Sequence, residues 1–248
     1  FFTCPNHAGD QMNGYILKPT NFDPSKRYPV VMSQYSGPGS QSVLDKWTID
    51  WEYYLVSKGF IVACVDGRGT GGRSRAYETS VYMQLGKLET EDQVAGAEYM
   101  RTLPYVDDKH IGIYGWSYGG YETLMAMSTS NGTYQAGVAI APVTDWRYYD
   151  TIYAERFMRT PNENNEGYEQ SAPITHAEKL KGDLLIISGT ADDNVHYLNT
   201  LQYSAALIEA GIQFDTQIYT NKDHHIRGCN TRHHLYIKVC NFFLDKLK

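Results

Sequence analysis

The 248-residue sequence lacks several features that define other classes of protein. It contains no run of eighteen apolar residues, so we expect no membrane-spanning helix. Basic residues are not in excess, since the net charge is −6, and this argues against nucleic acid as the partner. We find no internal repeat, low-complexity linker or second domain. The remaining composition, 42% hydrophobic and 20% charged, is typical of one α/β domain with a sizeable core.

Cysteine is also scarce, and its spacing is not that of a metal site or a redox motif. One cysteine lies inside the apolar run 60–65, where we expect a buried, small hydrophobic residue. The other three are compatible with pairing or with free thiols, so cysteine usage does not indicate the compartment. The cysteines are Cys4, Cys64, Cys229 and Cys240.

The first residue is Phe1 rather than Met, and no signal peptide is visible. We therefore expect a processed chain or an excised fragment, for which any export signal would lie upstream.

The stretch 110–121 is the most informative part of the sequence. Ile111 and Ile113 indicate a buried strand, and a helix is predicted over 119–128. Between them lies Gly115-Trp-Ser-Tyr-Gly119, which matches G-x-S-x-G. Chemically, this pattern exposes a serine hydroxyl on a sharp strand-to-helix turn, and the helix start directs N–H groups at a developing oxyanion. The sequence thus predicts Ser117 as a nucleophile.

Apolar strands and amphipathic helices alternate along the rest of the chain. This order predicts a mostly parallel sheet with helices on both faces. Besides the elements around Ser117, we predict strands over 12–17, 28–35, 60–65, 136–141, 184–187 and 213–219, and helices over 47–58, 90–101, 195–210 and 232–246.

A glycine-rich loop follows the strand at 60–65. Gly67, Gly69 and Gly72 fit G-x-G-x-x-G, the pattern of dinucleotide-binding loops. However, residues 73–86 show no apolar helical stripe, and no second strand ends in an acidic residue about twenty residues on. We therefore predict a structural loop beside an active site, and no cofactor.

A nucleophilic serine needs a base and an acid that orients the base. In this architecture both follow later in the chain, on loops after strands, the acid first. The loop after 184–187 offers Asp192 or Asp193, and the loop after 213–219 offers His224 or His225. Within Asp192-Asp193-Asn194, we expect one residue to cap the following helix and another to orient the histidine. For the other histidines we expect surface, packing or structural roles, and no metal site: His7, His110, His176, His196, His233 and His234.

Three motifs together resemble the catalytic domain of the prolyl oligopeptidase family, which has the α/β-hydrolase fold. They are Gly115-Trp-Ser-Tyr-Gly-Gly-Tyr121, Gly189-Thr-Ala-Asp-Asp-Asn-Val-His196 and Asp223-His224. Within the family, the dipeptidyl peptidase IV branch is the most similar, from about Met12 to the last helix. The resemblance implies that Ser117 is the nucleophile, Asp192 the acid and His224 the base. It also implies that the Tyr35 hydroxyl and the Tyr118 backbone N–H bind the oxyanion.

The same resemblance assigns the tyrosine-rich segment after residue 142 to a pocket for a penultimate proline. A flat aromatic pocket suits a pyrrolidine ring, which is apolar and offers no N–H. The alternative is that these aromatics are ordinary core, but the polar segment 145–150 would make a poor core. The implied pocket residues are Val143, Trp146, Tyr149, Tyr153, Tyr118 and Val195, with Asn194 binding a substrate carbonyl.

The chain departs from the family pattern in two ways. The family has glycine after the catalytic histidine, where this chain has His225. Family members also carry an N-terminal β-propeller, which in dipeptidyl peptidases grips the substrate's amino terminus with acidic residues. The 248 residues cannot supply it, so we expect residues 1–248 to be the catalytic domain of a longer, exported enzyme. The resemblance further suggests a homodimer formed partly through the C-terminal helices.

The predicted function is a serine peptidase that cleaves after proline or alanine near the N-terminus of peptides. It would release Xaa-Pro dipeptides through an acyl-enzyme. The alternatives are a prolyl tripeptidyl peptidase, an acyl-aminoacyl peptidase, a simple esterase on the same fold, and a catalytically inactive interaction domain.

Overall fold

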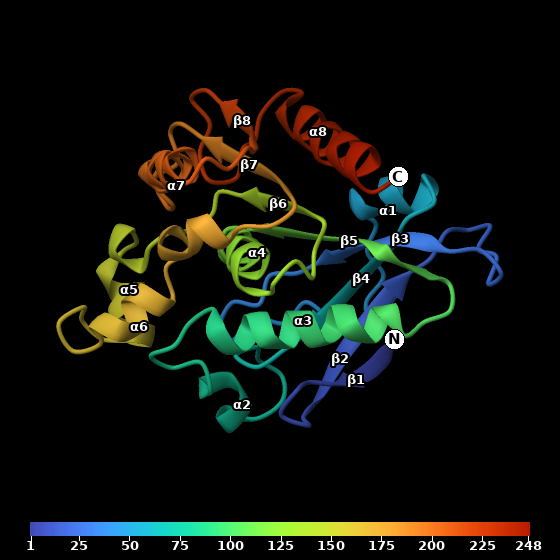
Figure 1. The fold of residues 1–248 in the computed structure, drawn as a ribbon, viewed down its shortest axis with the longest axis horizontal. Coiled ribbons are helices and arrows are strands. Elements are labelled where there is room, and N and C mark those ends of the chain that lie inside the picture. The colour runs from blue at the N-terminus through green and yellow to red at the C-terminus, as the bar shows by residue number, and fades with distance from the viewer.

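One eight-stranded sheet runs through the computed structural model, which describes residues 1–248 (Figure 1). Its strands lie in the order β1-β2-β4-β3-β5-β6-β7-β8. The pairs β1–β2 and β2–β4 are antiparallel, and every other neighbouring pair is parallel. The strands are Phe2–Pro5 (β1), Gln11–Leu17 (β2), Tyr28–Ser33 (β3), Ile61–Asp66 (β4), Val106–Trp116 (β5), Ala136–Ile140 (β6), Asp183–Gly189 (β7) and Asp215–Tyr219 (β8).

Helices connect the strands and cover the sheet. They are Glu52–Ser57 (α1), Arg75–Thr79 (α2), Lys87–Arg101 (α3), Tyr118–Thr129 (α4), Thr151–Met158 (α5), Asn165–Gln170 (α6), Leu198–Glu209 (α7) and Thr231–Lys246 (α8), with 3-10 helices at Trp146–Tyr148 (η1) and Pro173–Lys179 (η2).

The two faces of the sheet form two separate cores, because successive side chains of a strand point to opposite faces. In β3, for example, Val30 and Met32 join the core under α3, α4 and α7, whereas Val31 joins the core under α1 and α8. The strands are therefore apolar throughout, as expected for a parallel sheet covered on both sides. The predicted α/β-hydrolase architecture, a mostly parallel sheet with helices on both faces, is confirmed.

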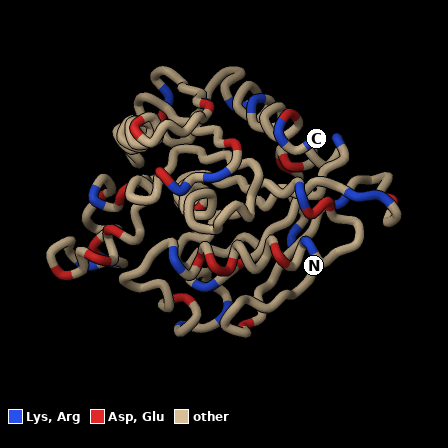
Figure 2. Tube along the Cα trace, viewed as in Figure 1, with Lys and Arg blue, Asp and Glu red and all other residues tan.

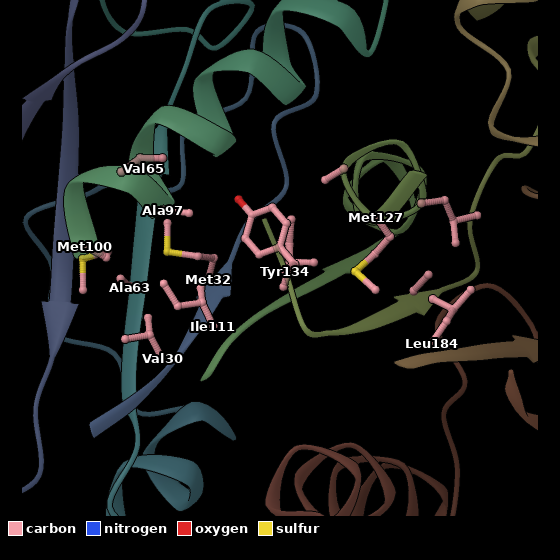
Figure 3. Packing of buried hydrophobic residues seen from close by; sticks show 14 of the residues in the cluster. Val30, Met32, Ala63, Val65, Ala97, Met100, Ile111, Met127, Tyr134 and Leu184 are labelled. Carbon is pink, nitrogen blue, oxygen red and sulfur yellow. The ribbon is translucent and has the colours of Figure 1, made fainter. Parts of the chain in front are cut away.

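Small and flexible side chains fill the space between α3 and the sheet (Figure 3). Ala97 of α3 packs in one cluster with Met32 of β3 and Ala63 of β4, all fully buried. Tyr134, beside them, is also buried, and its hydroxyl donates to the Gln93 carbonyl at 2.7 Å. This close packing fixes α3 against β3 and β4 in the middle of the sheet.

Every predicted strand and helix is present, but three predicted helix starts are wrong. The helix predicted over 47–58 begins only at Glu52, the one predicted over 90–101 begins earlier, at Lys87, and the one predicted over 195–210 begins at Leu198. The residues before Leu198 instead form a turn around Asp192. Sequence reasoning also missed β1 and the short helices α2, α5 and α6. These are four to eight residues long, too short for a periodic pattern to show.

No helix is long and apolar enough to cross a membrane. All four cysteines are free; Cys229 is exposed and the others, including Cys64, are buried. Acidic and basic residues are interspersed along the chain (Figure 2).

Candidate active site

Ser117 occupies a sharp turn between β5 and α4, with φ 60° and ψ −116°. Residues other than glycine rarely adopt positive φ, so this backbone is strained. The turn is held on both sides, because the Ser117 N–H donates to the Ile140 carbonyl at 2.8 Å and its carbonyl accepts from the Tyr121 N–H at 2.9 Å. The strained geometry projects the hydroxyl beyond the end of β5.

The flanking glycines are required by close backbone approach. A Cβ on Gly115 would collide with the Gly119 carbonyl, and a Cβ on Gly119 would lie 2.6 Å from the Gln34 carbonyl oxygen. Gln34 also donates through Nε2 to the Gly119 carbonyl at 2.8 Å. The G-x-S-x-G spacing thus reflects the packing of β5 and α4 around Ser117.

Ser117, His224 and Asp192 form a hydrogen-bonded chain. His224 Nε2 lies 2.9 Å from Ser117 Oγ, and His224 Nδ1 lies 2.8 Å from Asp192 Oδ2. The Asp192 and His224 side chains are almost fully buried. A buried carboxylate at Nδ1 keeps the proton on that nitrogen and leaves Nε2 as the acceptor toward the hydroxyl.

Parallel strands bring these three side chains together, because their carboxyl ends share one edge of the sheet. Ser117 follows β5, Asp192 follows β7 and His224 follows β8. The two later loops also bond to each other: the Ala191 N–H donates to the Lys222 carbonyl at 3.0 Å.

Asp192 both holds its own loop and contacts the histidine. Its Oδ1 accepts from the N–H groups of Asn194 and Val195, each at 2.9 Å, while Oδ2 faces His224. The expectation that one residue caps the next helix and another orients the histidine is therefore wrong. Asp192 makes both contacts, and α7 begins at Leu198 with no side-chain cap.

The other candidates of the two loops lie outside this chain of hydrogen bonds. Asp193 and His225 are both exposed. The His225 ring centroid is 5.8 Å from that of His224, and its backbone N–H donates to Asp223. Four of the histidines elsewhere have hydrogen-bond partners of their own: His7 with Glu98, His110 with Asp107, His176 with the Gln170 carbonyl and His234 with Tyr219.

Two hydrogen-bond donors near the start of α4 and the end of β3 lack a partner within the chain. Tyr118 is the first residue of α4, so its N–H has no partner within the helix. Tyr35, just after β3, is 40% exposed, and its hydroxyl bonds to no group of the chain. The Tyr35 and Tyr118 ring centroids are 6.1 Å apart.

The pocket residues implied by the resemblance gather in a third apolar cluster. Trp146, at its centre, stacks on Tyr153 at 5.7 Å and meets Tyr149 and Tyr118 at 5.8 and 5.5 Å. Tyr118, Val143, Trp146 and Val195 are buried, whereas Tyr149 and Tyr153 are only partly buried. The arrangement is an aromatic cluster whose outer rings remain accessible.

Asn194 lies at the rim of this cluster. The Tyr149 hydroxyl donates to Asn194 Oδ1 at 2.8 Å. This bond orients the amide and leaves the Asn194 Nδ2 hydrogens available to a carbonyl oxygen from outside the chain. Both residues also line an open cavity of about 680 Å³.

The glycine-rich loop after β4 is bonded to other segments of the chain, namely residues 39–43 and α3. Asp66 accepts from the N–H groups of Ser42 and Val43, and the Gly39 N–H donates to the Gly69 carbonyl. Arg68 is paired with buried Asp92 at 2.7 Å. These contacts agree with the prediction of a structural loop. No group of three or more His, Cys, Asp or Glu side chains is arranged to hold a metal ion.

Sequence reasoning missed several groups that contact the site. The Trp116 indole N–H donates to the His224 carbonyl at 3.0 Å, and the Tyr118 hydroxyl donates to Glu89 at 2.7 Å. Burial raises the pKa of Glu89 to about 7 and raises the pKa of Glu122 well above its usual value. The available signal was acidic residues at core-facing positions of the helices at 87–101 and 118–129.

Comparison with known proteins identifies the family of this chain. The family model described as the prolyl oligopeptidase family matches residues 47–248. The chain belongs to the prolyl oligopeptidase family. The match covers the Ser117 turn and the loops that carry Asp192 and His224.

The proteins to which this chain is similar are named dipeptidyl peptidases or dipeptidyl-aminopeptidases. The chain is 41% identical over 242 residues to a "probable dipeptidyl-aminopeptidase B" of Metarhizium robertsii, covering 96% of the chain and 26% of that protein. It is 41% identical to dipeptidyl peptidase 4 of Sus scrofa, covering 92% of the chain and 30% of that protein. The crystal structure of Porphyromonas gingivalis dipeptidyl peptidase 4 superposes with a TM-score of 0.98 at 54% identity, covering 100% of this chain and 35% of that one. The chain thus spans about a quarter to a third of the length of these relatives.

Proposed function

We propose that this chain is the catalytic domain of a serine dipeptidyl peptidase that cleaves after a penultimate proline or alanine. The observation that carries the proposal is the hydrogen-bonded chain Ser117–His224–Asp192, at 2.9 and 2.8 Å, beside an aromatic cluster. The names of the relatives support the same activity.

The first step is acylation of Ser117. His224 Nε2 takes the hydroxyl proton as Ser117 Oγ attacks the carbonyl carbon of the penultimate proline. Asp192 stabilises the imidazolium that forms. The C–N bond then breaks, and His224 gives the proton to the leaving amine. Water attacks the acyl-enzyme with His224 again as the base, and this releases the dipeptide and restores Ser117.

The oxyanion of each tetrahedral intermediate needs donors that are already in place. We assign this role to the Tyr118 N–H, at the start of α4, and to the unpartnered Tyr35 hydroxyl. Each such donor contributes about 3 kcal/mol of transition-state stabilisation.

Substrate selection follows from the aromatic cluster and its rim. Trp146, Tyr153 and Tyr118, with Val143 and Val195, present an apolar surface to a compact pyrrolidine ring. The Asn194 amide, oriented by Tyr149, donates to the carbonyl of the substrate's first residue.

The relatives are longer than this chain, and we place the parts that limit substrate length in the region of the full-length protein outside residues 1–248. An N-terminal β-propeller with acidic residues would bind the free amino terminus and limit cleavage to dipeptides. An exported location and a homodimer are part of the same proposal. The exposed Leu201 and Ile208 of α7 offer apolar surface for such a dimer.

Two measurements test the proposal. A fluorophosphonate should label this chain at Ser117 and not label Ser117→Ala; absence of labelling in the folded chain would leave an inactive interaction domain. The full-length protein should cleave a chromogenic Gly-Pro substrate much faster than Ala-Ala-Pro or amino-blocked Gly-Pro. Preference for either of the latter would move the enzyme to the tripeptidyl or acyl-aminoacyl class.

A further inference from the structure

Beneath the aromatic cluster lies a buried carboxyl group that the catalytic chain does not use. The Tyr118 hydroxyl donates to Glu89 Oε1 at 2.7 Å, and both residues are at most 3% exposed. Glu89 has no ion-pair partner, and its Oε2 is buried without a hydrogen bond. Burial of a carboxyl group is costly for folding, and the Tyr118 hydroxyl is the one side-chain donor that this carboxyl group meets.

We propose that Glu89 is a positioning residue, whose carboxylate holds the Tyr118 ring in place as the wall of the proline pocket. This inference rests on the proposed function and assigns the residue that sets its specificity.

Tyr118 is the point where such an anchor acts most directly on the site. It follows Ser117 in the chain, its N–H is the assigned oxyanion donor, and its ring meets Tyr121 at 5.1 Å and Trp146 at 5.5 Å. Apolar contacts alone permit small movements of the ring, whereas a hydrogen bond to a carboxylate fixes the position of its hydroxyl. Glu89 therefore fixes the ring from α3, a different helix.

A second buried carboxyl group, that of Glu122 on α4, lies nearby. The Thr90 hydroxyl donates to the Gly86 carbonyl at 2.6 Å and to Glu122 Oε1 at 2.7 Å, a shared hydrogen bond of the kind common near helix ends. Burial, and then the charge of Glu89, raise the pKa of Glu122 well above its usual value. Glu122 thus bonds to Thr90, whereas Glu89 is the carboxyl group that bonds to Tyr118.

Glu89 is the group that ionises near neutral pH. The titratable groups that face it are Asp92 on its own helix, Tyr118, Tyr121 and Glu122 on α4, and Tyr153 on α5. The cation on this side, Arg68, is paired with Asp92 and Glu91. Burial raises the pKa of Glu89 to about 7, so the Tyr118 hydrogen bond loses its charge as the pH falls below that value.

The test uses the full-length protein with Glu89→Gln, which keeps an acceptor for Tyr118 but cannot ionise. The matched control is Glu122→Gln, because Glu122 is also a buried carboxyl group but its side chain hydrogen-bonds to Thr90 and not to Tyr118 or Ser117. Gly-Pro and Gly-Ala chromogenic substrates are compared across pH 5–9, with thermal unfolding to show that each variant is folded.

We expect Glu89→Gln to lower kcat/KM for Gly-Pro about tenfold, mainly through KM, and to change Gly-Ala much less. We also expect the acid limb of log kcat/KM for Gly-Pro to become less steep in Glu89→Gln, because the ionisation of Glu89 no longer contributes to it. Glu122→Gln should keep both the wild-type proline preference and the wild-type slope.

The result that overturns the proposal is a folded Glu89→Gln with wild-type proline preference and an unchanged acid limb. Equal losses on both substrates with an unchanged slope would also overturn it, since they indicate a structural role only. Failure of the wild type to cleave Gly-Pro or to react with a fluorophosphonate would instead refute the proposed function, and the positioning role with it.

Discussion

The Trp116 indole N–H donates to the backbone carbonyl of His224 at 3.0 Å. The residue that precedes the candidate nucleophile thus fixes the loop that carries the candidate base. Arg232, from α8, lies over the Trp116 ring, with its Cζ 4.4 Å from the ring centroid, and so also restrains the indole. The separation between Ser117 Oγ and His224 Nε2 therefore depends on this indole as well as on Asp192.

Replacing this indole by phenylalanine should slow turnover without unfolding the protein. Trp116→Phe keeps an aromatic ring under Arg232 but leaves the His224 carbonyl without its donor, so the imidazole is held less firmly. We expect kcat to fall about tenfold while KM changes little. Steady-state kinetics with Gly-Pro measures this, and a kcat equal to that of the wild type would show that the bond does not position His224.

The strain at Ser117 should be visible as a difference in stability between two inactive variants. Ser117→Ala keeps the unfavourable φ of 60°, whereas Ser117→Gly accommodates it. We expect the glycine variant to be more stable than the alanine variant by about 1 kcal/mol. Urea unfolding of the two proteins compares them directly; equal or lower stability of the glycine variant would contradict strain at this turn.

Asp192→Asn should separate the two roles of that side chain. Its Oδ1 still accepts from the Asn194 and Val195 N–H groups, but an amide at the other position favours the wrong imidazole tautomer. We expect kcat to fall by about 10³ to 10⁴ with little change in Tm. The exposed Asp193→Asn is the control and should retain wild-type kcat; the reverse pattern would exchange the two residues.

Glu89→Gln should stabilise the protein more at alkaline than at acid pH. The pKa of Glu89 is raised from 4.5 to about 7, so the unfolded chain loses this proton first as the pH rises. Between about pH 4.5 and 7 the wild type therefore loses stability relative to the variant, by on the order of 2–3 kcal/mol, and above pH 7 the difference is constant. Denaturant unfolding at pH 5 and pH 8 measures it, and a pH-independent difference would mean that Glu89 does not ionise.

Local sequence patterns were enough for the fold and for Ser117. Alternating apolar strands and amphipathic helices predicted the mostly parallel sheet, because a strand buried on both faces is apolar along its whole length. The turn at Ser117 was predictable because Gly115 and Gly119, whose backbones approach each other across it, both lie within one short sequence motif. The short helices α5 and α6 were not predicted, because packing and capping rather than a periodic pattern stabilise them. At the start of α5, for example, the Tyr153 N–H donates to the Asp150 side chain.

The sequence by itself determined the sheet, the strained serine turn and the two loops after β7 and β8. It left Asp192 and Asp193, and His224 and His225, as equal candidates until the family resemblance was considered. The tertiary structure adds a physical distinction between them, since it buries Asp192 and His224 and exposes Asp193 and His225. The contact of Glu89 with Tyr118 likewise joins residues 29 positions apart on two helices, and no local pattern encodes which faces of two helices meet.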